Sequence, residues 1–505
     1  MRRNMNLDQS TVMGIDLGTQ SIKVVIYHPE KKEILAMASQ PFELNSKDDG
    51  SMEQQASWWI QGFHKCLETI SPEIKKTVIA IGVSGQQHGF VPIDKDGSVL
   101  APVKLWCDTS TVLECEEIMD AVGGEEACIK ISGNSIAVGY TASKIRYLKK
   151  NNPDAYDKMT SILLPHDYLN FYLTGNLTME CGDASGTGLL NIKTREWSKR
   201  LITALDNDRD LSSCLPNLIN ADDLCGTIKH DLADSLGLSS NVIISAGGGD
   251  NMMAAIGTGN VETGKLTASL GTSGTLFAYN DSPAIDPDGA LAAFCSSNGG
   301  WLPLLCTMNC TVATKQIRHL LDVDLEKVES LASNIPPGAD GVITVPFFNG
   351  ERTPALPNAK ASIFGLDSHN TTNAHLIRSA MEAAIFSLKA GIEAFERCNM
   401  NFNEVTLTGG GSKSALWRQI CADVLNLPVR ILKSDENAAF GAALQAHWAH
   451  GKFQGNQSKL KDICKNHLFE DKNKDCSPNT ENVKKYKKVY QEYQSFVKLI
   501  AQHYQ

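Results

Sequence analysis

The sequence predicts an α/β protein made of two large halves built on one plan, and three observations support this prediction. The chain has 505 residues, which is too long for one ordinary hydrophobic core. Many of its 40 glycines stand where short apolar runs end, as expected of buried strands that lead into tight turns. An internal repeat is visible in the chain. A predicted strand that ends in Leu-Gly-Thr and is followed by a hydroxyl residue occurs at residues 11–21 and again at residues 265–273.

We expect three segments: an N-terminal domain at residues 11–255, a C-terminal domain at residues 256–450, and a polar excursion with a final helix at residues 451–505. Residues 112–190 have the helical and looped pattern of an inserted lobe that walls a pocket. In the final helix, apolar side chains recur at intervals of three and four, which predicts docking onto its own domain, with a homodimer contact as the alternative. These side chains are Val483, Tyr486, Tyr490, Tyr493, Val497, Ile500 and Tyr504.

The composition argues against several classes of partner. The net charge is −10 and no stripe of lysine and arginine is visible, so we expect neither nucleic acid nor an anionic membrane as a partner. No apolar run reaches membrane-spanning length, and the basic N-terminus lacks the apolar region of a signal peptide. The fourteen cysteines include no C-x-x-C pair, which favours buried thiols over a metal site and predicts a cytoplasmic protein.

The first copy of the repeated turn carries a carboxylate and several hydroxyl groups. Asp16 stands near the end of an apolar strand, Thr19, Gln20 and Ser21 form the turn, and Lys23 follows on a return strand. A tight turn of this composition suits a phosphate group held by backbone N–H groups, although a plain β-hairpin has the same pattern.

Two triple-glycine turns follow later in the chain. The first, Gly247-Gly248-Gly249, ends a buried strand and leads into Asp250 and Asn251 at the start of an apolar helix, so the backbone can approach a ligand closely. The second occupies residues 409–411 and precedes a serine-capped helix, which is typical of an anion or nucleotide site. Either turn alone is also compatible with a purely structural role.

Polar side chains gather after two other predicted strands. Gln87 and His88 follow the strand at residues 78–83, beyond the carboxyl end where open α/β sheets bind ligands. Trp106 offers an apolar face to a sugar, and Asp108, two residues later, is suited to accept hydrogen bonds from sugar hydroxyls. The alternatives are a structural His88, a core Trp106 and an Asp108 that caps a helix.

Together, the repeated turn and the two triple-glycine turns resemble the plan of two actin-like (ribonuclease H-like) ATPase domains with a cleft between them. More narrowly, residues 11–450 resemble the FGGY family of carbohydrate kinases. The C-terminal signature of that family is matched at residues 362–366, 375–376 and 379–382. Its N-terminal signature is matched at residues 141–145, with Tyr147 where the family often has tryptophan.

Residues 86–89, 164–169, 183–187 and 350–354 most resemble the branch of the family that acts on D-xylulose, although Gln87 and Cys107 stand where that branch often has methionine and asparagine. The resemblance implies ATP-dependent phosphorylation of a pentulose. The expected reaction converts D-xylulose to D-xylulose 5-phosphate. The alternatives are a kinase of D-ribulose, L-ribulose, glycerol or gluconate, a non-catalytic actin-like ATP-binding protein, and a sugar-sensing regulator without catalysis.

The resemblance also implies roles for individual residues, with ATP and Mg²⁺ as cofactors and a cleft that closes around them. Asp250 is the expected general base, accepting the hydroxyl proton late in the transfer, and Asp16 is expected to hold Mg²⁺ through water. The sugar would contact Gln87, His88, Trp106, Asp108, Asp250 and Asn251. The β- and γ-phosphates would contact Thr19, Gln20, Ser21, Lys23, Gly271, Thr272 and Ser273. The adenosine side would be lined by Gly409, Gly410, Gly411, Ser412 and Lys413.

Overall fold

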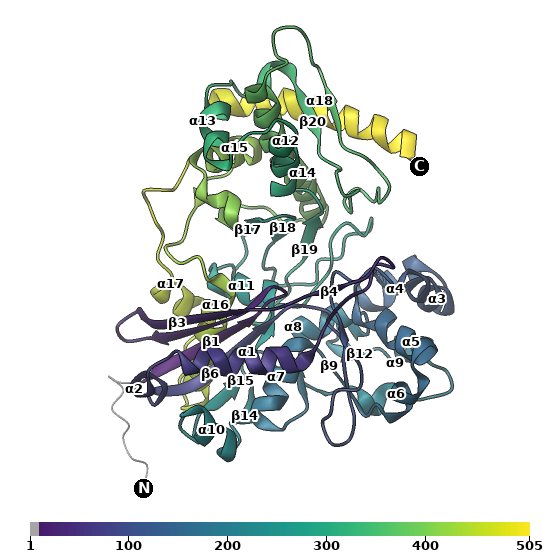
Figure 1. Ribbon diagram of the computed structural model, residues 1–505, viewed down its shortest axis with the longest axis vertical. Coiled ribbons are helices and arrows are strands. Elements are labelled where there is room, and N and C mark those ends of the chain that lie inside the picture. Colours follow the sequence, from purple (N-terminus) through teal and green to yellow (C-terminus); the bar gives the residue numbers. More distant parts are fainter. Residues whose placement is uncertain (1–9, 505) are drawn as a thin grey trace.

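The computed structural model of the chain describes residues 10–504 and places two mixed sheets in two halves of the molecule (Figure 1). The first sheet has the strand order β14-β15-β6-β1-β2-β3, and β16 also pairs with β6. Its strands are β1 (Thr11–Leu17), β2 (Ser21–His28), β3 (Glu33–Pro41), β6 (Val78–Gly85), β14 (Leu224–Thr227), β15 (Ile243–Ser245) and β16 (Gly248–Gly249).

The second sheet repeats the central pairing of the first. Its order is β19-β18-β17-β22-β23. Strand β17 pairs antiparallel with β18 and parallel with β22, as β1 pairs antiparallel with β2 and parallel with β6. Its strands are β17 (Lys265–Leu270), β18 (Gly274–Phe277), β19 (Leu304–Thr307), β22 (Glu404–Thr408) and β23 (Val429–Arg430). The predicted fold of two α/β halves on one plan is confirmed.

Helices cover both sheets. Those of the N-terminal half are α1 (Ala56–Glu68), α2 (Pro72–Lys75), α7 (Pro165–Thr174), α10 (His230–Leu236) and α11 (Asp250–Gly257). Those that pack around the second sheet include α12 (Thr311–Leu320), α13 (Leu325–Ser333), α14 (Asn373–Arg397) and α15 (Ala415–Leu425). Residues 410–413 form a short 3₁₀ turn, and Ser414 caps α15 by accepting a hydrogen bond from the Trp417 N–H, so the helix begins with the serine cap that the sequence indicates.

The predicted lobe is a helical bundle beside the first sheet with its own hydrophobic cluster (Figure 1). Its helices are α3 (Val112–Val122), α4 (Glu125–Ser132), α5 (Thr141–Asn151), α6 (Pro153–Lys158), α8 (Cys181–Ala184) and α9 (Lys199–Leu205). Two small sheets lie in the same half of the molecule. One has three strands, β4 (Asn45–Ser46), β5 (Met52–Gln54) and β8 (Val103–Lys104), and the other pairs β7 (Val91–Ile93) with β9 (Ser161–Leu163).

A helix from late in the sequence returns to the first sheet. Helix α16 (Asn437–Phe453) packs on β1, β6 and α11, followed by α17 (Leu460–His467), which packs on α16. Glycines allow this close contact: a Cβ atom on Gly14 would lie 1.8 Å from the Ala439 carbonyl oxygen, and one on Gly441 would lie 1.8 Å from that of Met253. The predicted boundaries at residues 255 and 450 stay a prediction, because α16 lies against the N-terminal sheet in space.

We expect Gly441→Ala to destabilise the protein by about 1–3 kcal/mol or more, since the new methyl group has no room between α16 and α11. Gly451 is a matched control in the same helix, because the nearest atoms to a Cβ there would belong to the Asn456 side chain, at 3.6 Å or more. Gly451→Ala should leave stability unchanged or raise it by up to about 1 kcal/mol. Thermal midpoints of both variants test this, and equal midpoints would contradict the packing argument.

The final helix α18 (Thr480–Tyr504) docks on α15 and β20 (Ile343–Val345), and its tyrosines hydrogen-bond to side chains of α14, as its apolar stripe predicts. Tyr486, Tyr490, Tyr493 and Ile500 are buried there. The Tyr490 hydroxyl donates to Glu393 (2.9 Å), and the Tyr493 hydroxyl lies 3.0 Å from that of Ser387. Across the described part of the chain, no helix combines the length and the apolarity needed to cross a membrane.

Candidate active site

The first sheet brings three of the predicted polar groups to one edge. Asp16 lies near the end of β1, Gln87 follows β6, and Asp250 follows β16 as the first residue of α11. Because β1, β6 and β16 are parallel, their carboxyl ends meet. A cavity of about 580 Å³ opens there, lined by both halves of the molecule. From the N-terminal half it is lined by residues including Gln87, His88, Trp106, Tyr140, Asp250 and Asn251, and from the C-terminal half by residues including Ser269, Ser273, Cys306 and Arg352.

Asp250 and Asp16 are two buried carboxylates whose pKa values are both raised. Burial raises the pKa of Asp250 to about 7, helped by the nearby charge of Asp16. Burial likewise raises the pKa of Asp16 to about 6, against a hydrogen bond from Ser84 and the charge of Lys23. Lys23 is paired elsewhere, its Nζ lying 2.7 Å from Glu436 Oε2. The site therefore concentrates negative charge that a cationic ligand or a neighbouring cation would relieve.

Asn251 orients two of its neighbours. Its backbone N–H and its Nδ2 donate to Asp250 Oδ1 at 2.7 and 3.0 Å, and Nδ2 also donates to Gln87 Oε1 at 2.9 Å. Among the described residues nothing donates to Asp250 Oδ2, so this oxygen is the one available to a ligand. Asp250, Asn251 and Gln87 thus form one connected group at the wall of the cavity.

A buried ionic group lies behind Gln87. In the sequence its residues belong to segments 164–169 and 183–187, which resemble the family, and no role was predicted for them individually. His166 is fully buried between two carboxylates, with Nδ1 2.6 Å from Asp183 Oδ2 and Nε2 2.9 Å from Asp167 Oδ1. Burial disfavours the charged imidazole, yet Asp167 and Asp183 hold the pKa of His166 well above its ordinary value. Asp183 also interacts with the amide side chain of Gln87, so the group supports Gln87 from behind.

His88 is held in an unusual backbone conformation. Its φ is +64°, a region that non-glycine residues rarely adopt. Its carbonyl oxygen accepts from Lys144 Nζ (2.7 Å) and Thr141 Oγ1 (3.2 Å), which hold that conformation. Burial, then the charges of Lys144 and Arg352, lower the pKa of the imidazole to about 3. The neutral ring lies against Tyr140, with centroids 4.7 Å apart, at the cavity wall.

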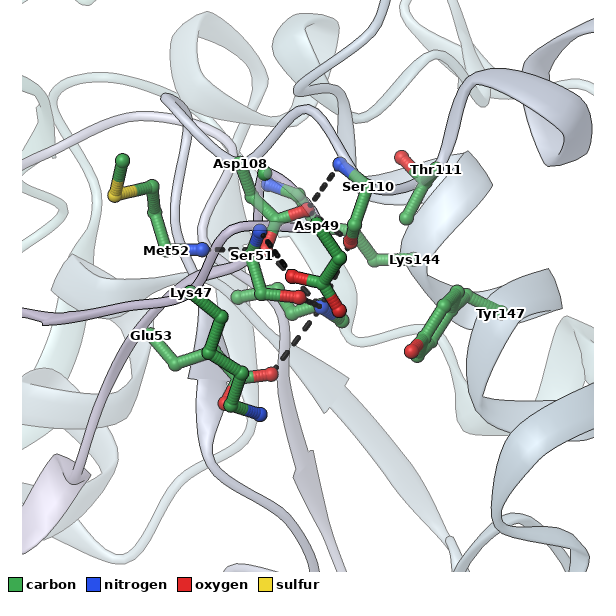
Figure 2. Close-up of polar contacts among 12 residues, drawn as sticks. Lys47, Asp49, Ser51, Met52, Glu53, Asp108, Ser110, Thr111, Lys144 and Tyr147 are labelled. Atoms are coloured by element: carbon green, nitrogen blue, oxygen red, sulfur yellow. Dashed lines mark hydrogen bonds and ion pairs between the residues drawn. The ribbon is translucent and has the colours of Figure 1, made fainter.

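The structure separates Trp106 from Asp108. Trp106 lines the cavity, is 36% exposed, and donates from Nε1 to Thr19 Oγ1 at 3.0 Å. Asp108 is fully buried and accepts from the Met52 N–H (2.9 Å), Lys104 Nζ (3.0 Å) and the Ser110 hydroxyl (2.6 Å). Figure 2 shows Met52 and Ser110 beside Asp108. The turn from Leu105 to Asp108 sends the two side chains apart, so Asp108 is placed to hold the turn rather than to receive a sugar hydroxyl.

The glycine-rich turns of the second half lie side by side. Ser273, in the second Leu-Gly-Thr turn, lines the cavity together with Asp250. The backbone of Gly409 approaches the end of β17 so closely that a Cβ there would lie 2.9 Å from the Leu270 carbonyl carbon. The residues proposed for the γ-phosphate and for the adenosine are therefore neighbours in space. Lys413 lies near Asp435, with Nζ 3.3 Å from Oδ2.

The cavity is also lined by residues that were not among the predicted site residues, notably Tyr140 and Arg352. Tyr140 precedes the matched N-terminal signature, and Arg352 lies inside the quoted segment at residues 350–354. Nothing in their local pattern indicates a ligand, since each reaches the cavity only through packing between distant elements. Among the described residues, no cluster of three or more His, Cys, Asp or Glu side chains is arranged to hold a metal ion by protein ligands alone.

A polar cavity lined by two ATPase-like halves, with a glycine-rich turn of the second half at its wall, is the arrangement of a phosphotransferase for small molecules. Comparisons with known proteins place the chain within that class. Residues 11–257 match the N-terminal domain, and residues 266–450 the C-terminal domain, of the FGGY family of carbohydrate kinases. The chain belongs to the FGGY family of carbohydrate kinases, so the predicted family and enzyme class are confirmed.

Individual relatives support the same placement. The xylulose kinase of Haemophilus influenzae is 42% identical over 488 residues, covering 95% of this chain and 98% of that protein. A solved structure described as a xyloylose kinase from Brucella ovis superposes with a TM-score of 0.88 at 27% identity, covering 96% and 98% of the two chains. A gluconate kinase from Lactobacillus acidophilus, 24% identical and covering 98% and 99% of the two chains, has the same fold with a TM-score of 0.88.

Proposed function

We propose that this protein transfers the γ-phosphoryl group of ATP to O5 of D-xylulose. The observation that carries the proposal is the cavity at Asp250: a carboxylate with a raised pKa, next to an amide pair, between a sugar-sized space and the second phosphate turn. The 42% identity to the xylulose kinase of Haemophilus influenzae supports D-xylulose as the sugar.

Asp250 is the proposed general base. Asn251 engages Oδ1, which leaves Oδ2 to accept the proton of the attacking hydroxyl. A pKa raised to about 7 makes this carboxylate a stronger proton acceptor than an ordinary aspartate, while a substantial fraction remains ionised at neutral pH. The proton moves to Asp250 as the O–P bond forms and the bond between the γ-phosphorus and the β,γ-bridging oxygen breaks.

The sugar is held by groups that suit hydroxyls. The amides of Gln87 and Asn251 and the rings of His88 and Tyr140 offer donors and acceptors, and Trp106 offers an apolar face. Asp108 does not contact the sugar in this proposal. It holds the turn that carries Trp106, through its hydrogen bonds with Met52 and Lys104.

The phosphates lie, in this proposal, between the two Leu-Gly-Thr turns, with Thr19, Gln20, Ser21 and Lys23 on one side and Gly271, Thr272 and Ser273 on the other. The adenosine lies along residues 409–413. Asp16 fits a Mg²⁺ ion held through water, because Oδ1 accepts from Ser84 while Oδ2 has no hydrogen-bond donor among the described residues. Bound there, the ion supplies charge neutralisation for the β- and γ-phosphates. Closure of the cleft then excludes water.

We also infer a reducing cytoplasm as the compartment of this protein. All fourteen cysteines are free thiols, and burial raises the pKa of several of them, for example Cys66 to about 11. Unpaired cysteines in this number are typical of reducing compartments.

The test is ADP release with Mg·ATP and a panel of acceptors: D-xylulose, D-ribulose, L-ribulose, L-xylulose, gluconate and glycerol. We expect the highest kcat/KM with D-xylulose. A higher value for another acceptor would contradict the proposed sugar while leaving phosphoryl transfer intact, and would direct attention to Gln87 and Cys107. ATP binding without phosphorylation of any acceptor would contradict the enzymatic proposal itself.

A further inference from the structure

The chemistry of the proposed reaction restricts the form of the sugar. A 2-pentulose closes its five-membered ring by adding O5 to the C2 carbonyl, so O5 carries a free hydroxyl only in the open chain. A 5-kinase must therefore bind the keto form, whose carbonyl oxygen accepts hydrogen bonds and donates none. The site needs a donor for that oxygen in addition to groups that suit hydroxyls.

We propose that Arg352 is this donor and that it binds the ketone end of the open-chain sugar; the proposal rests on the proposed function above. Arg352 lines the cavity from the C-terminal half, opposite His88 and Tyr140. Burial sets the direction of both pKa shifts, lowering the pKa of His88 and raising that of Tyr140, and the positive charge of Arg352 is near enough to act on both in the lowering direction. Among the described residues its guanidinium has no ion-pair partner and no hydrogen-bond acceptor, so its donors are available to a ligand.

The loop that carries Arg352 is anchored from behind. It connects β20 (Ile343–Val345) to β21 (Ser362–Phe364) and extends from the C-terminal half toward the N-terminal half (Figure 1). Glu351 is 2% exposed, and its carboxylate accepts from the Met308 N–H (2.7 Å) and Asn309 Nδ2 (3.1 Å). The backbones of Glu351 and Leu356 exchange two hydrogen bonds of 2.9 Å. A buried acidic residue thus fixes the base of the loop while its neighbour faces the cavity.

The donor inventory of the cavity favours this arginine, because the indole N–H of Trp106, which is also a donor only, already donates to Thr19 Oγ1. Gln87, Asn251, His88 and Tyr140 each carry acceptor as well as donor atoms, which suits hydroxyl groups. A guanidinium carries only donors and keeps its charge at every relevant pH, which suits a carbonyl oxygen. Because Arg352 comes from the other half of the molecule, its contact with the ketone would also draw the cleft closed around the sugar.

The experiment compares D-xylulose with xylitol and D-arabitol, the two alcohols formed by reducing its carbonyl group. We expect the native protein to prefer the ketose. In Arg352→Met, kcat/KM for D-xylulose should fall by about 10 to 100-fold, the strength of a hydrogen bond to a charged group, while the values for the two alcohols change by less than about threefold. Arg352→Lys keeps the charge but loses the planar fork of the guanidinium. Its kcat/KM for D-xylulose should lie between those of the native protein and Arg352→Met.

Lys360→Met is the matched control, since Lys360 is an exposed cation of the same loop that does not line the cavity. This variant should leave kcat/KM unchanged for D-xylulose, xylitol and D-arabitol. Quenching of the intrinsic tryptophan fluorescence, to which Trp106 in the cavity contributes, by each sugar without ATP gives a second readout that is independent of turnover, and thermal midpoints exclude a folding defect. If kcat/KM falls equally for the ketose and the alcohols in Arg352→Met, then Arg352 acts on the nucleotide and the proposal is overturned. An unchanged kcat/KM for D-xylulose would overturn it as well.

The acceptor panel separates this inference from the proposed function. If the native protein prefers D-ribulose, the function proposed above is wrong, and the ratio of D-ribulose to ribitol and D-arabitol in Arg352→Met tests the arginine in the same way. If the native protein prefers glycerol, no ketone is bound and both proposals fail before any variant is made.

Discussion

Replacing Asp250 by asparagine lowers kcat for sugar phosphorylation by about 10²-fold to 10⁴-fold, the contribution typical of a positioned proton acceptor. Asparagine keeps the size of the side chain and the start of α11 but cannot accept the hydroxyl proton. The KM for ATP should change little, because Asp250 lies on the sugar side of the cavity. Steady-state ADP release measures both parameters. Activity within threefold of the native protein would contradict the assignment of Asp250.

The stability of the same variant shows whether the loss is chemical. Asp250 has a pKa of about 7 in the folded protein against an ordinary value of 3.8. Between these values the folded state binds more protons than the unfolded state, so the contribution of this group to stability falls as pH rises from about 4 to about 7. Asparagine removes the cost of the buried charge. The thermal midpoint of Asp250→Asn should therefore exceed that of the native protein at pH 8, and the difference should shrink toward pH 4.

The pH dependence of the native protein follows from the same group. Burial raises the pKa of Asp250 to about 7 and that of Asp16 to about 6, and the charge of Asp16 adds to the shift of Asp250. We expect kcat/KM to be low below pH 6, where Asp250 is protonated, and to rise with pH toward a plateau above about 7. A profile that is flat between pH 5 and pH 8 would contradict a base with a raised pKa.

Arg378→Met has the largest expected effect on stability. Arg378 and Glu382 are 5% and 1% exposed, and their side chains meet at 2.7 Å inside the contact between α14 and α18. The Tyr486 hydroxyl lies 2.8 Å from both partners. Methionine leaves a buried carboxylate without its cation, which costs about 3–5 kcal/mol. We expect a lower thermal midpoint and release of α18, detected as faster proteolysis near the C-terminus.

Two variants control this measurement. Lys484→Met removes an exposed ion pair with Glu481 on α18, where both side chains are more than half exposed, and should change stability by less than about 1 kcal/mol. Arg378→Met combined with Glu382→Leu removes both charges and should recover part of the loss, because no unpaired charge remains. If the double variant is less stable than Arg378→Met, the cost lies in packing rather than in the unpaired charge.

The sequence by itself determined the local elements and the chemistry they carry. Apolar runs that end in Leu-Gly-Thr indicate the two hairpins, and the intervals of three and four in residues 483–504 indicate a docked helix, because hydrophobic periodicity depends only on near neighbours. The positions of Asp16, Gln87 and Asp250 after buried strands also place them at one edge of a sheet. These features depend on which residue follows which, and a single chain contains that information.

The tertiary structure alone decided which side chains face the cavity. Trp106 and Asp108 are two residues apart, yet one lines the cavity and the other is buried among Met52, Lys104 and Ser110, because the direction of a side chain in a turn is set by what packs behind it. Arg352 reaches the cavity on a loop anchored by Glu351, and α16 crosses back to the first sheet through glycine contacts. Such contacts join residues far apart in the chain, and no local pattern encodes them.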